Sequence, residues 1–284
     1  MATDFAQTDW FRLRTVDIAQ LDELTETLDD FARRAIDALV IRNVYPKDYM
    51  QEISRRIESH DPPFYIFPRL GSSDEVRRYK HLYGITLVAA NPNLTEYFSV
   101  AKSFHDHLRE LFGEGHDFEE RMRYIFSVLS GGRPVVLPQS KNEQIYMPAT
   151  IRILPEGSTI DLHCDNNLSH HPNYDHLRTL CDVNNQLSYF VTISAPDEGG
   201  ELVIYRRQWS ADDDALNQYE MRKDDSMVED YEYFSVKPEP GDLILHAGGR
   251  VYHRVTQSIG PRTRHTVGGF VANAFDNDTL YYFS

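Results

Sequence analysis

The chain has 284 residues, of which 41% are hydrophobic and 26% charged, a composition typical of a globular protein with a buried core. The formal net charge of -15 argues against binding to nucleic acid or to an anionic membrane surface, because both partners reward clustered Lys and Arg. Two cysteines, Cys164 and Cys181, are too few for a disulfide framework, and the sequence shows neither a signal peptide nor a long apolar run, so we expect a cytoplasmic protein.

The first part of the chain, residues 1–146, is predicted to be mainly helical. Between positions 18 and 31, apolar residues recur at spacings of three or four, which gives a helix one apolar and one acidic face. They are Ile18, Leu21, Leu24, Leu28 and Phe31. A short strand is predicted next, and then three helices that begin after a proline or end at a glycine. The strand spans 38–44 and the helices span 47–60, 91–113 and 117–132.

The second part, residues 147–284, is predicted to form a β-core. Eight short runs rich in β-branched and aromatic residues follow one another there, bounded by Gly, Pro, Asn or Asp. They span 149–157, 158–165, 186–196, 199–209, 231–242, 242–249, 251–260 and 264–275. Such a series favours a double-sheet arrangement, and no linker separates it from the helical part. We therefore expect one α+β domain over 1–284, with a double-stranded β-helix (jelly roll) core and packed N-terminal helices.

A candidate metal site lies at the end of the second β-run, in "IDLHCDNNLSHH". His163 and Asp165 are two residues apart, so that their side chains can point to the same side of a strand. His253, about 90 residues downstream in "PGDLILHAGGRVYHRV", is the best candidate for a third ligand. Two imidazoles and one carboxylate form the ligand set of non-haem Fe(II) oxygenases, which keep other coordination positions open for a chelating cosubstrate and O2.

An arginine near the metal would allow this acidic protein to bind a dianion. Arg262 and Arg264 follow the distal histidine in "GPRTRHTVGGF", and a guanidinium can form a bidentate pair with the far carboxylate of 2-oxoglutarate. The two positions are two residues apart, so their side chains would lie on the same face of a strand. Spacing alone therefore does not choose between them.

Several stretches of the chain resemble a known group of enzymes. They are "ATIRILPEG", "QLSYFVTISAPDEGGELVIY", "PGDLILHAGGRVYHRV", "HTVGGF" and the closing "LYYFS", with weaker similarity in "VIRNVYPKDYM", "LYGITLVAANPNLTEYF" and "DFEERMRYIFSVLSG". From about Leu39 to the C-terminus, the chain resembles the free-standing indole-alkaloid (welwitindolinone-type) halogenases and, more distantly, the N-succinyl amino acid hydroxylases. Both are Fe(II)/2-oxoglutarate-dependent oxygenases.

The resemblance implies roles for individual residues. His163 and His253 fall on the two iron-binding histidines, and Arg264 falls on an arginine that the halogenases also have, whereas the position of Arg262 is serine in them. Asp165 departs from the halogenases, which have glycine there and thereby leave a coordination site for chloride. The resemblance therefore favours Arg264 for the 2-oxoglutarate carboxylate, and hydroxylation in place of chlorination.

Other residues near these motifs have competing interpretations. His170, His171 and His176 are expected in a polar loop and not as ligands. Cys164 should point to the face opposite His163, where a small buried apolar residue fits, and Asp161 is placed at a strand edge or near a substrate amine.

Some side chains are candidates for either the pocket wall or ordinary core packing: Ile151, Ile153, Ile160 and Tyr189. The stretch "GITLVAANPNL" aligns with a region near the substrate in the related enzymes.

The reaction expected from these residues is hydroxylation of an unactivated C–H bond in a free small molecule, such as an amino acid derivative or a natural-product scaffold. Succinate and CO2 would be released, and no carrier protein is expected to present the substrate. A desaturase, cyclase or halogenase on the same scaffold is an alternative, and a non-catalytic jelly-roll metal-binding protein is another. The sequence does not indicate the oligomeric state.

Overall fold

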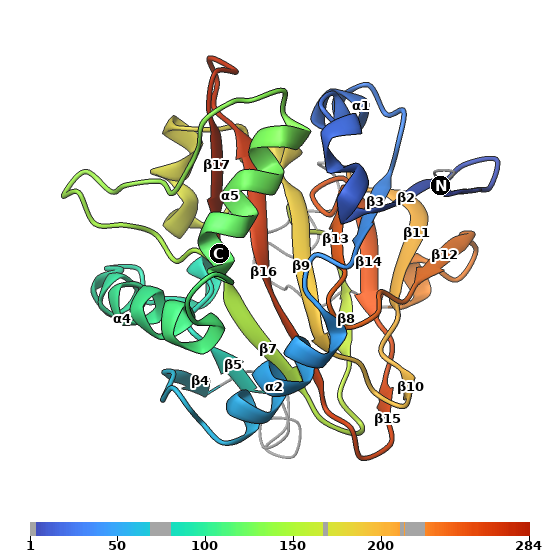
Figure 1. Cartoon of the computed structure of the whole chain (residues 1–284). Helices are drawn as coiled ribbons and strands as arrows, with labels where there is room; N and C mark the ends of the chain where they lie inside the picture. Colours follow the sequence, from blue (N-terminus) through green and yellow to red (C-terminus); the bar gives the residue numbers. More distant parts are fainter. Residues whose placement is uncertain (1–3, 69–80, 167–169, 211–212, 214–224) are drawn as a thin grey trace.

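Two β-sheets face each other, and α-helices cover the outer side of the larger sheet (Figure 1). The computed structural model describes residues 4–68, 81–166, 170–210, 213 and 225–284. All eight β-runs predicted after residue 147 form strands. The observed fold is thus mixed α and β, with large antiparallel sheets.

The larger sheet contains eleven strands in the described residues. Their bounds are β1 Asp4–Gln7, β2 Arg12–Asp17, β3 Ala38–Arg42, β4 Ile66–Pro68, β5 His81–Tyr83, β6 Val135–Val136, β7 Thr150–Leu154, β9 Leu187–Ser194, β13 Leu243–His246, β16 Arg264–Asn273 and β17 Leu280–Phe283. The order is β1-β2-β3-β13-β9-β16-β7-β5-β4, with β17 paired to β16 and β6 paired to β17. Only β2–β3 and β6–β17 are parallel among these described pairs.

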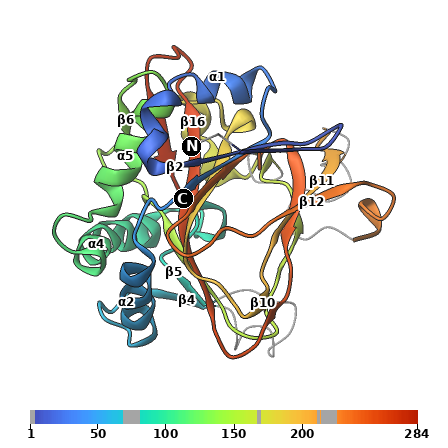
Figure 2. The same ribbon diagram turned by 45° about the vertical axis from the view of Figure 1, so that its right-hand side comes forward.

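The smaller sheet has four strands in the described part of the chain, in the order β12-β11-β14-β8. Its strands are β8 Ile160–His163, β11 Leu202–Gln208, β12 Tyr233–Val236 and β14 Val251–Val255, and a separate pair joins β10 Glu198–Gly199 to β15 Ser258–Ile259. Figure 2 shows this sheet standing opposite the larger one. Apolar side chains of both sheets meet between them, among them Val40 and Ile244 from the large sheet and Leu202 and Ile204 from the small one.

The α-helices whose bounds the structure describes lie in the N-terminal half. Their bounds are α1 Thr27–Ala32, α2 Lys47–Glu58, α4 Thr95–Phe112 and α5 Phe118–Leu129, and short 3-10 turns are η1 Ile18–Glu23, η2 Leu87–Ala89, η3 Pro172–Tyr174, η4 Leu177–Thr179, η5 Val183–Asn185 and η6 Asp225–Met227. The helices and the large sheet share one apolar core, in which Phe126 of α5 packs edge-on against Tyr189 of β9 at 4.9 Å between ring centroids. In the described residues no helix is both long and apolar enough to cross a membrane.

Strand alternation divides the large sheet into a helix-facing side and a side that faces the small sheet. In β9, Tyr189 and Val191 belong to the core under the helices, whereas Ser188 and Phe190 line a cavity between the sheets. Polar side chains on the inner face therefore stay in the molecule's interior without entering the apolar core. This inner face is where the candidate site is found.

The helix expected between residues 18 and 31 forms as two shorter pieces, η1 and α1. Asp17 caps η1, because its carboxylate accepts the N–H of Ala19 at 2.9 Å, and the chain turns again before Thr27. The apolar pattern is still buried, since a 3-10 helix also brings positions three apart to one face. The strands β1, β2, β4, β5 and β6 were not predicted, so the first 146 residues contribute to the sheet as well as to the helical layer.

Candidate metal centre

His163 and His253 are direct cross-strand neighbours in the small sheet. His163 ends β8, His253 lies in the middle of β14, and the antiparallel register pairs the two residues, with their ring centroids 4.2 Å apart. Asp165 follows two residues after His163, where β8 has ended. Sheet pairing thus brings together residues about 90 positions apart in the sequence.

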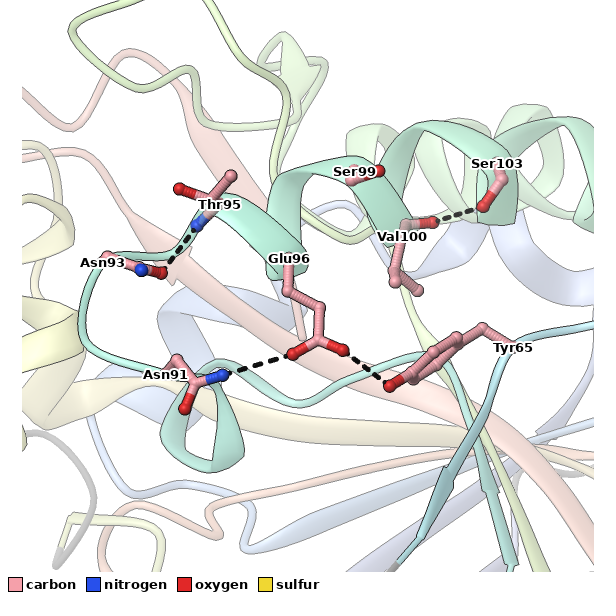
Figure 3. Close-up of a pocket in the computed structure, with 8 residues that line it drawn as sticks. All are labelled: Tyr65, Asn91, Asn93, Thr95, Glu96, Ser99, Val100 and Ser103. Atoms are coloured by element: carbon pink, nitrogen blue, oxygen red, sulfur yellow. Dashed lines mark hydrogen bonds between the residues drawn. The ribbon is translucent and has the colours of Figure 1, made fainter.

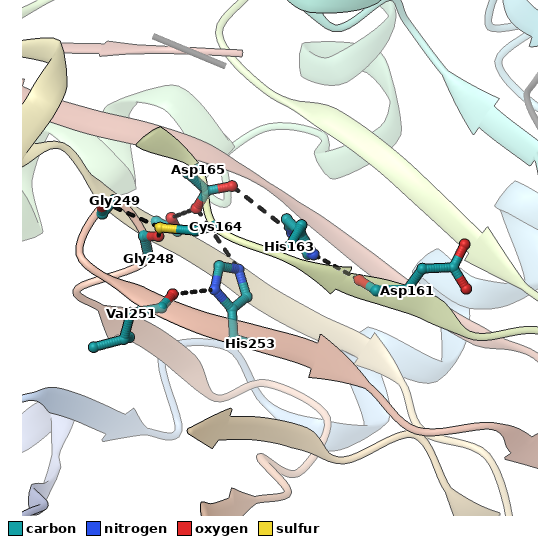
Figure 4. Close-up of polar contacts among 9 residues, drawn as sticks. Asp161, His163, Cys164, Asp165, Gly248, Gly249, Val251 and His253 are labelled. Carbon is teal, nitrogen blue, oxygen red and sulfur yellow. Dashed lines mark hydrogen bonds and ion pairs between the residues drawn. The ribbon is translucent and has the colours of Figure 1, made fainter. Parts of the chain in front are cut away.

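The three side chains offer their polar atoms to one point (Figure 4). One ligand atom from each residue lies within 4.8 Å of the others. The Nε2 atoms of His163 and His253 are each 3.7 Å from an oxygen of Asp165, from Oδ1 and Oδ2 respectively. Exposed fractions of 14%, 5% and 5% for the His163, Asp165 and His253 side chains place this group inside the protein.

Backbone hydrogen bonds fix the orientation of both imidazoles. Nδ1 of His163 is 2.7 Å from the carbonyl oxygen of Asp161, and Nδ1 of His253 is 3.0 Å from that of Val251. A carbonyl oxygen only accepts, so each Nδ1 carries a hydrogen, and in the neutral form of each ring the lone pair is then on Nε2. Both Nε2 atoms therefore face the shared point in the form that binds a metal.

Two further contacts hold Asp165. The Ser188 hydroxyl donates to its Oδ2, and the Asp165 N–H donates to the carbonyl oxygen of Gly248 at 3.0 Å. Glycine is required at position 248, because a Cβ there would collide with the Asp165 carboxylate and the Ser188 hydroxyl. The carboxylate is thus held at one angle by neighbours on β9 and on the β13–β14 turn.

The electrostatics of the group suit a cation. Burial, with His253 adding to it, lowers the pKa of His163 to about 4, so its imidazole is neutral at pH 7. Burial raises the pKa of the Asp165 carboxyl, but His253, His163 and the Ser188 hydrogen bond outweigh it, and the net pKa lies below its usual range. Two neutral imidazoles and one carboxylate form the donor set typical of non-haem Fe(II) sites, and these residues can hold such an ion.

His163, Asp165 and His253 line a cavity between the two sheets, which we call the metal-facing cavity. Two arginines, Arg264 and Arg152, line it as well. Arg264, the first residue of β16, is buried, lies 5.2 Å from the Phe190 ring centroid and donates to the carbonyl oxygen of Gly200 at 3.2 Å. Burial, together with Arg152, lowers the pKa of Arg264 to about 10, which leaves the guanidinium charged at neutral pH. Arg262 is different: it precedes β16, its side chain is 58% exposed, and it pairs with Asp197 at 2.7 Å.

Arg152 of β7 is a second cation in the same cavity. Burial lowers its pKa, and the negative charge of Asp165 opposes that shift. Among the described residues, the Arg152 guanidinium has no hydrogen-bond or ion-pair partner. A buried charge without a counter-charge is costly, so two guanidiniums in one cavity indicate a ligand with two negative charges.

Sequence reasoning missed three residues of this site: Arg152, Ser188 and His246. His246 ends β13, lines the cavity and packs edge-on against His253 at 4.8 Å between ring centroids, and burial lowers its pKa to about 3. Arg152 gave a readable signal, because it interrupts the apolar run "TIRIL" on the strand face opposite Ile151 and Ile153. Ser188 and His246 gave none, since their positions depend on pairing between distant strands.

The neighbouring histidines have other roles, as expected. His171 accepts the N–H of Asn173 and caps η3, and Nδ1 of His176 is 3.2 Å from the Tyr146 hydroxyl oxygen. His170 is exposed. Among the described histidines, only His163 and His253 belong to the group that can hold a metal.

Cys164 and Asp161 point away from the metal centre. Cys164 is buried in an apolar cluster with Leu162 and Tyr252, as expected for a small apolar residue on the opposite face. Figure 4 shows the Asp161 carboxylate directed away from His163, which favours the strand-edge interpretation.

The residues with two interpretations separate into cavity and core. Ile160 lines the metal-facing cavity, whereas Ile151 and Ile153 pack in the core under the helices. Tyr189 borders the cavity, but its ring packs in the core and its hydroxyl donates to the carbonyl oxygen of Pro148 at 3.2 Å.

The stretch "GITLVAANPNL" does not line the metal-facing cavity in the described structure. Its Asn91 and Asn93 border an open surface groove at the start of α4 (Figure 3). Glu96 in that groove accepts hydrogen bonds from Tyr65 at 2.7 Å and from Asn91 at 3.2 Å.

Comparison with known proteins gives one family match and several similar folds. The model of a family described as carrier-protein-independent halogenase WelO5 matches residues 10–284. No curated protein sequence is significantly similar to the chain.

Two similar structures are those of an N-substituted L-amino acid dioxygenase from Burkholderia ambifaria AMMD. The complex with alpha-KG has a TM-score of 0.57 and 19% identity, over 91% of this chain and 90% of that one. The other structure has a TM-score of 0.55 and 17% identity, over 90% of each chain. The non-heme alpha ketoglutarate dependent epimerase SnoN from nogalamycin biosynthesis has a TM-score of 0.51 and 12% identity, over 89% and 85%. These likenesses show a shared fold.

Proposed function

The chain belongs to the family of the carrier-protein-independent halogenase WelO5, a family of Fe(II)/2-oxoglutarate-dependent enzymes, and we propose that this member is a hydroxylase. Its substrate would be a free small molecule, such as an amino acid derivative or a natural-product scaffold, oxidised at an unactivated C–H bond. The observation that carries this proposal is the carboxylate of Asp165, which lies with His163 and His253 where three donors can share one ion.

The proposal assigns His163, Asp165 and His253 as the ligands of Fe(II). When bound together with 2-oxoglutarate and O2, this metal supplies the oxidising power to break a C–H bond, with release of succinate and CO2. The chain's own contribution is to hold both imidazoles in one tautomer through backbone carbonyls and to fix the carboxylate through Ser188.

The two arginines of the cavity would bind the cosubstrate. 2-Oxoglutarate is a dianion, and the buried Arg264 and the half-buried Arg152 are cations that line the same cavity. We assign Arg264 to the carboxylate far from the metal, because its guanidinium is positioned by Gly200 and Phe190, and Arg152 to the end nearer Asp165. Arg262 is left outside this assignment, since it is exposed and already paired.

Apolar side chains close the rest of the cavity. Leu202 and Val255 of the small sheet and Phe190 of the large sheet line it. Such walls exclude water from a reactive centre and offer contact to an apolar part of a substrate.

The fold supports a single catalytic domain. We propose that the two facing sheets form a double-stranded β-helix (jelly roll) core, to which residues 1–146 add mainly helices and residues 147–284 most strands. Support comes from the apolar core that the helices share with the large sheet, and from cavity residues supplied by both sheets.

Halogenation is the second candidate, because the family description names it. It requires a coordination position for a halide, and the Asp165 carboxylate occupies the third donor position of this site. Desaturation or cyclisation would use the same residues, and the mass of the product distinguishes each outcome.

The experiment that tests the proposal has three steps. Anaerobic protein with Fe(II) and 2-oxoglutarate should show a weak visible charge-transfer band, and its absence from well-folded protein would contradict the assignment. His253→Ala should abolish succinate formation and O2 uptake, whereas His176→Ala, at a histidine outside the cavity, should not. Candidate substrates are then scored by mass spectrometry for the gain of one oxygen.

A further inference from the structure

A second cavity lies beneath α1, apart from the metal centre. It has a volume of about 260 Å³ and is bordered by α1, the start of β9, the β13–β14 turn and the end of β16. None of its lining residues lines the metal-facing cavity. At the volume of liquid water it would hold about nine water molecules, which is room for a small organic molecule.

The lining of this second cavity combines apolar side chains with two cations. Leu28 and Phe31 from the α1 side and Leu187 from β9 provide apolar surface, and Arg34 and Arg250 provide positive charge. Arg250 is 20% exposed and pairs with a single acid, Asp37, at 3.3 Å. Arg34 has no hydrogen-bond or ion-pair partner within the described part of the chain.

The lining also contains one acid, Asp182, and the amide of Gln186. The Asp182 carboxylate is engaged in its own turn, where it accepts the Asn184 N–H at 3.2 Å and the Asn185 side-chain amide at 2.7 Å. Gln186 is 1% exposed, and neither its amide nitrogen nor its amide oxygen has a partner in the described structure. Such buried groups are costly unless something completes their hydrogen bonds.

We propose that this second cavity is a binding site for a small carboxylate with an apolar body, such as a short fatty acid or a simple aromatic acid. The carboxylate would pair with Arg34 and with the N–H groups of Arg250 that remain beside its bonds to Asp37 at 3.3 Å and to the carbonyl oxygen of Phe31 at 3.4 Å. The hydrocarbon part would contact Leu28 and Phe31. Arg34 has no ion-pair partner among the described residues, so an anion bound beside it would gain one charge partner that the chain itself does not supply.

The site is placed to act on the metal centre through the β13–β14 turn. Ala247 and Arg250 of this turn line the second cavity, and the Arg250 N–H donates to the carbonyl oxygen of Ala247 at 2.9 Å. Between them, Gly248 accepts the N–H of Asp165 at 3.0 Å. A ligand that draws Arg250 toward itself therefore acts on the backbone that holds Asp165, and the site is regulatory.

Calorimetric titration of the full-length protein tests the binding site. Hexanoate and benzoate are the probes, and hexan-1-ol and benzyl alcohol are their neutral controls. Each titration is run with and without saturating 2-oxoglutarate, which would occupy the arginines of the metal-facing cavity. We expect both acids, or the one whose shape fits, to bind with and without 2-oxoglutarate, and the alcohols to bind at least about tenfold more weakly.

The variant Arg34→Ala should weaken binding of the acid by about two- to fivefold, because Arg34 is exposed and the loss of one exposed ion pair has a small effect. Arg33→Ala is the matched control, since Arg33 is the exposed neighbour and pairs with Asp30 at 2.8 Å. Loss of all binding in the presence of 2-oxoglutarate would place the acid in the metal-facing cavity and overturn the proposal. Equal affinity for the alcohols, or for wild type and Arg34→Ala, would overturn it as well.

A second measurement tests the regulation and rests on the proposed metal site, unlike the calorimetry. The visible spectrum of Co(II) bound to the protein should shift when the acid saturates the second cavity, and should not shift in Arg34→Ala at the same concentration. Binding by calorimetry without any spectral shift would overturn the regulatory connection. Failure of Co(II) to bind would instead contradict the metal site.

Discussion

Replacement of Arg264 should separate cosubstrate binding from folding. Arg264→Gln removes a buried guanidinium that faces the cavity, and loss of one partner from a buried charged pair costs about 2–5 kcal/mol, which is about 30-fold to 4,000-fold in affinity. Arg262→Gln is the matched control two residues away. Its side chain is 58% exposed and pairs with Asp197, so its loss should cost less than about 1 kcal/mol, or about fivefold.

The assay is anaerobic titration of the Fe(II)-loaded protein with 2-oxoglutarate, read from the visible charge-transfer band. Thermal unfolding of each variant serves as the folding check, because Arg264 also donates to Gly200 and packs on Phe190. The reasoning is refuted if folded Arg264→Gln binds 2-oxoglutarate within threefold of wild type, or if Arg262→Gln is equally impaired.

Three further predictions concern the metal ligand, its support and acid sensitivity. Asp165→Gly should lower the amount of hydroxylated product by more than about tenfold, the loss typical when a residue that supports a metal ligand is removed. With added chloride, this variant should also yield some chlorinated product. Asp161→Gly removes a carboxylate that is directed away from the site and should cause neither change. Ser188→Ala should weaken Fe(II) or Co(II) binding by about 10- to 100-fold in a metal titration, whereas Ser194→Ala on the same strand should leave it unchanged. Burial lowers the pKa of His265 to about 4 from 6.5, so this neutral histidine contributes stability that is full above pH 6.5 and is lost as the pH falls toward 4. Chemical denaturation of the metal-free protein measures the free energy of unfolding between pH 6.5 and 4. Over that range, His265→Gln should lose about 3 kcal/mol less of it than wild type, and equal losses would contradict the lowered pKa of His265.

The sequence was sufficient to predict the eight β-runs after residue 147 and to single out His163 and His253, but it missed β1, β2, β4, β5 and β6. The β-runs after residue 147 combine β-branched residues with turn residues at their ends, and both signals are local. His163 and Asp165 were recognisable because they are close in sequence. His253 was recognisable because it lies on a strand of similar character and because the family resemblance covers it.

The local sequence pattern could not show which of the two arginines, Arg262 or Arg264, lines the cavity. Residues 262 and 264 are two apart, so on one strand their side chains would point to the same face. However, β16 begins only at Arg264, where pairing with Leu154 of β7 starts. The preceding Gly260 and Pro261 hold Arg262 in a turn beside Asp197. Where a strand begins depends on its partner, which a local reading of one segment does not contain.

The inner faces of the two sheets posed the same difficulty. Arg152, Ser188 and His246 come from three strands of the large sheet, and they line one cavity together with His163 and His253 of the small sheet. Their role follows from the packing of one sheet on the other. In the sequence, each is one polar residue within an apolar run, a pattern that also occurs at exposed strand positions.

The carboxylate at position 165 limits the chemistry of this site more than the family name does. A divalent metal beside two neutral imidazoles is partly neutralised by one anionic donor, and Asp165 supplies that charge at 3.7 Å from each Nε2 atom. A bound halide would have to take a separate position, yet the backbone of Gly248 and the Ser188 hydroxyl already enclose the carboxylate. Carboxylate and halide therefore compete for the same space. Removal of the side chain at 165 should therefore open a position for chloride, which the Asp165 carboxylate fills in the proposed hydroxylase.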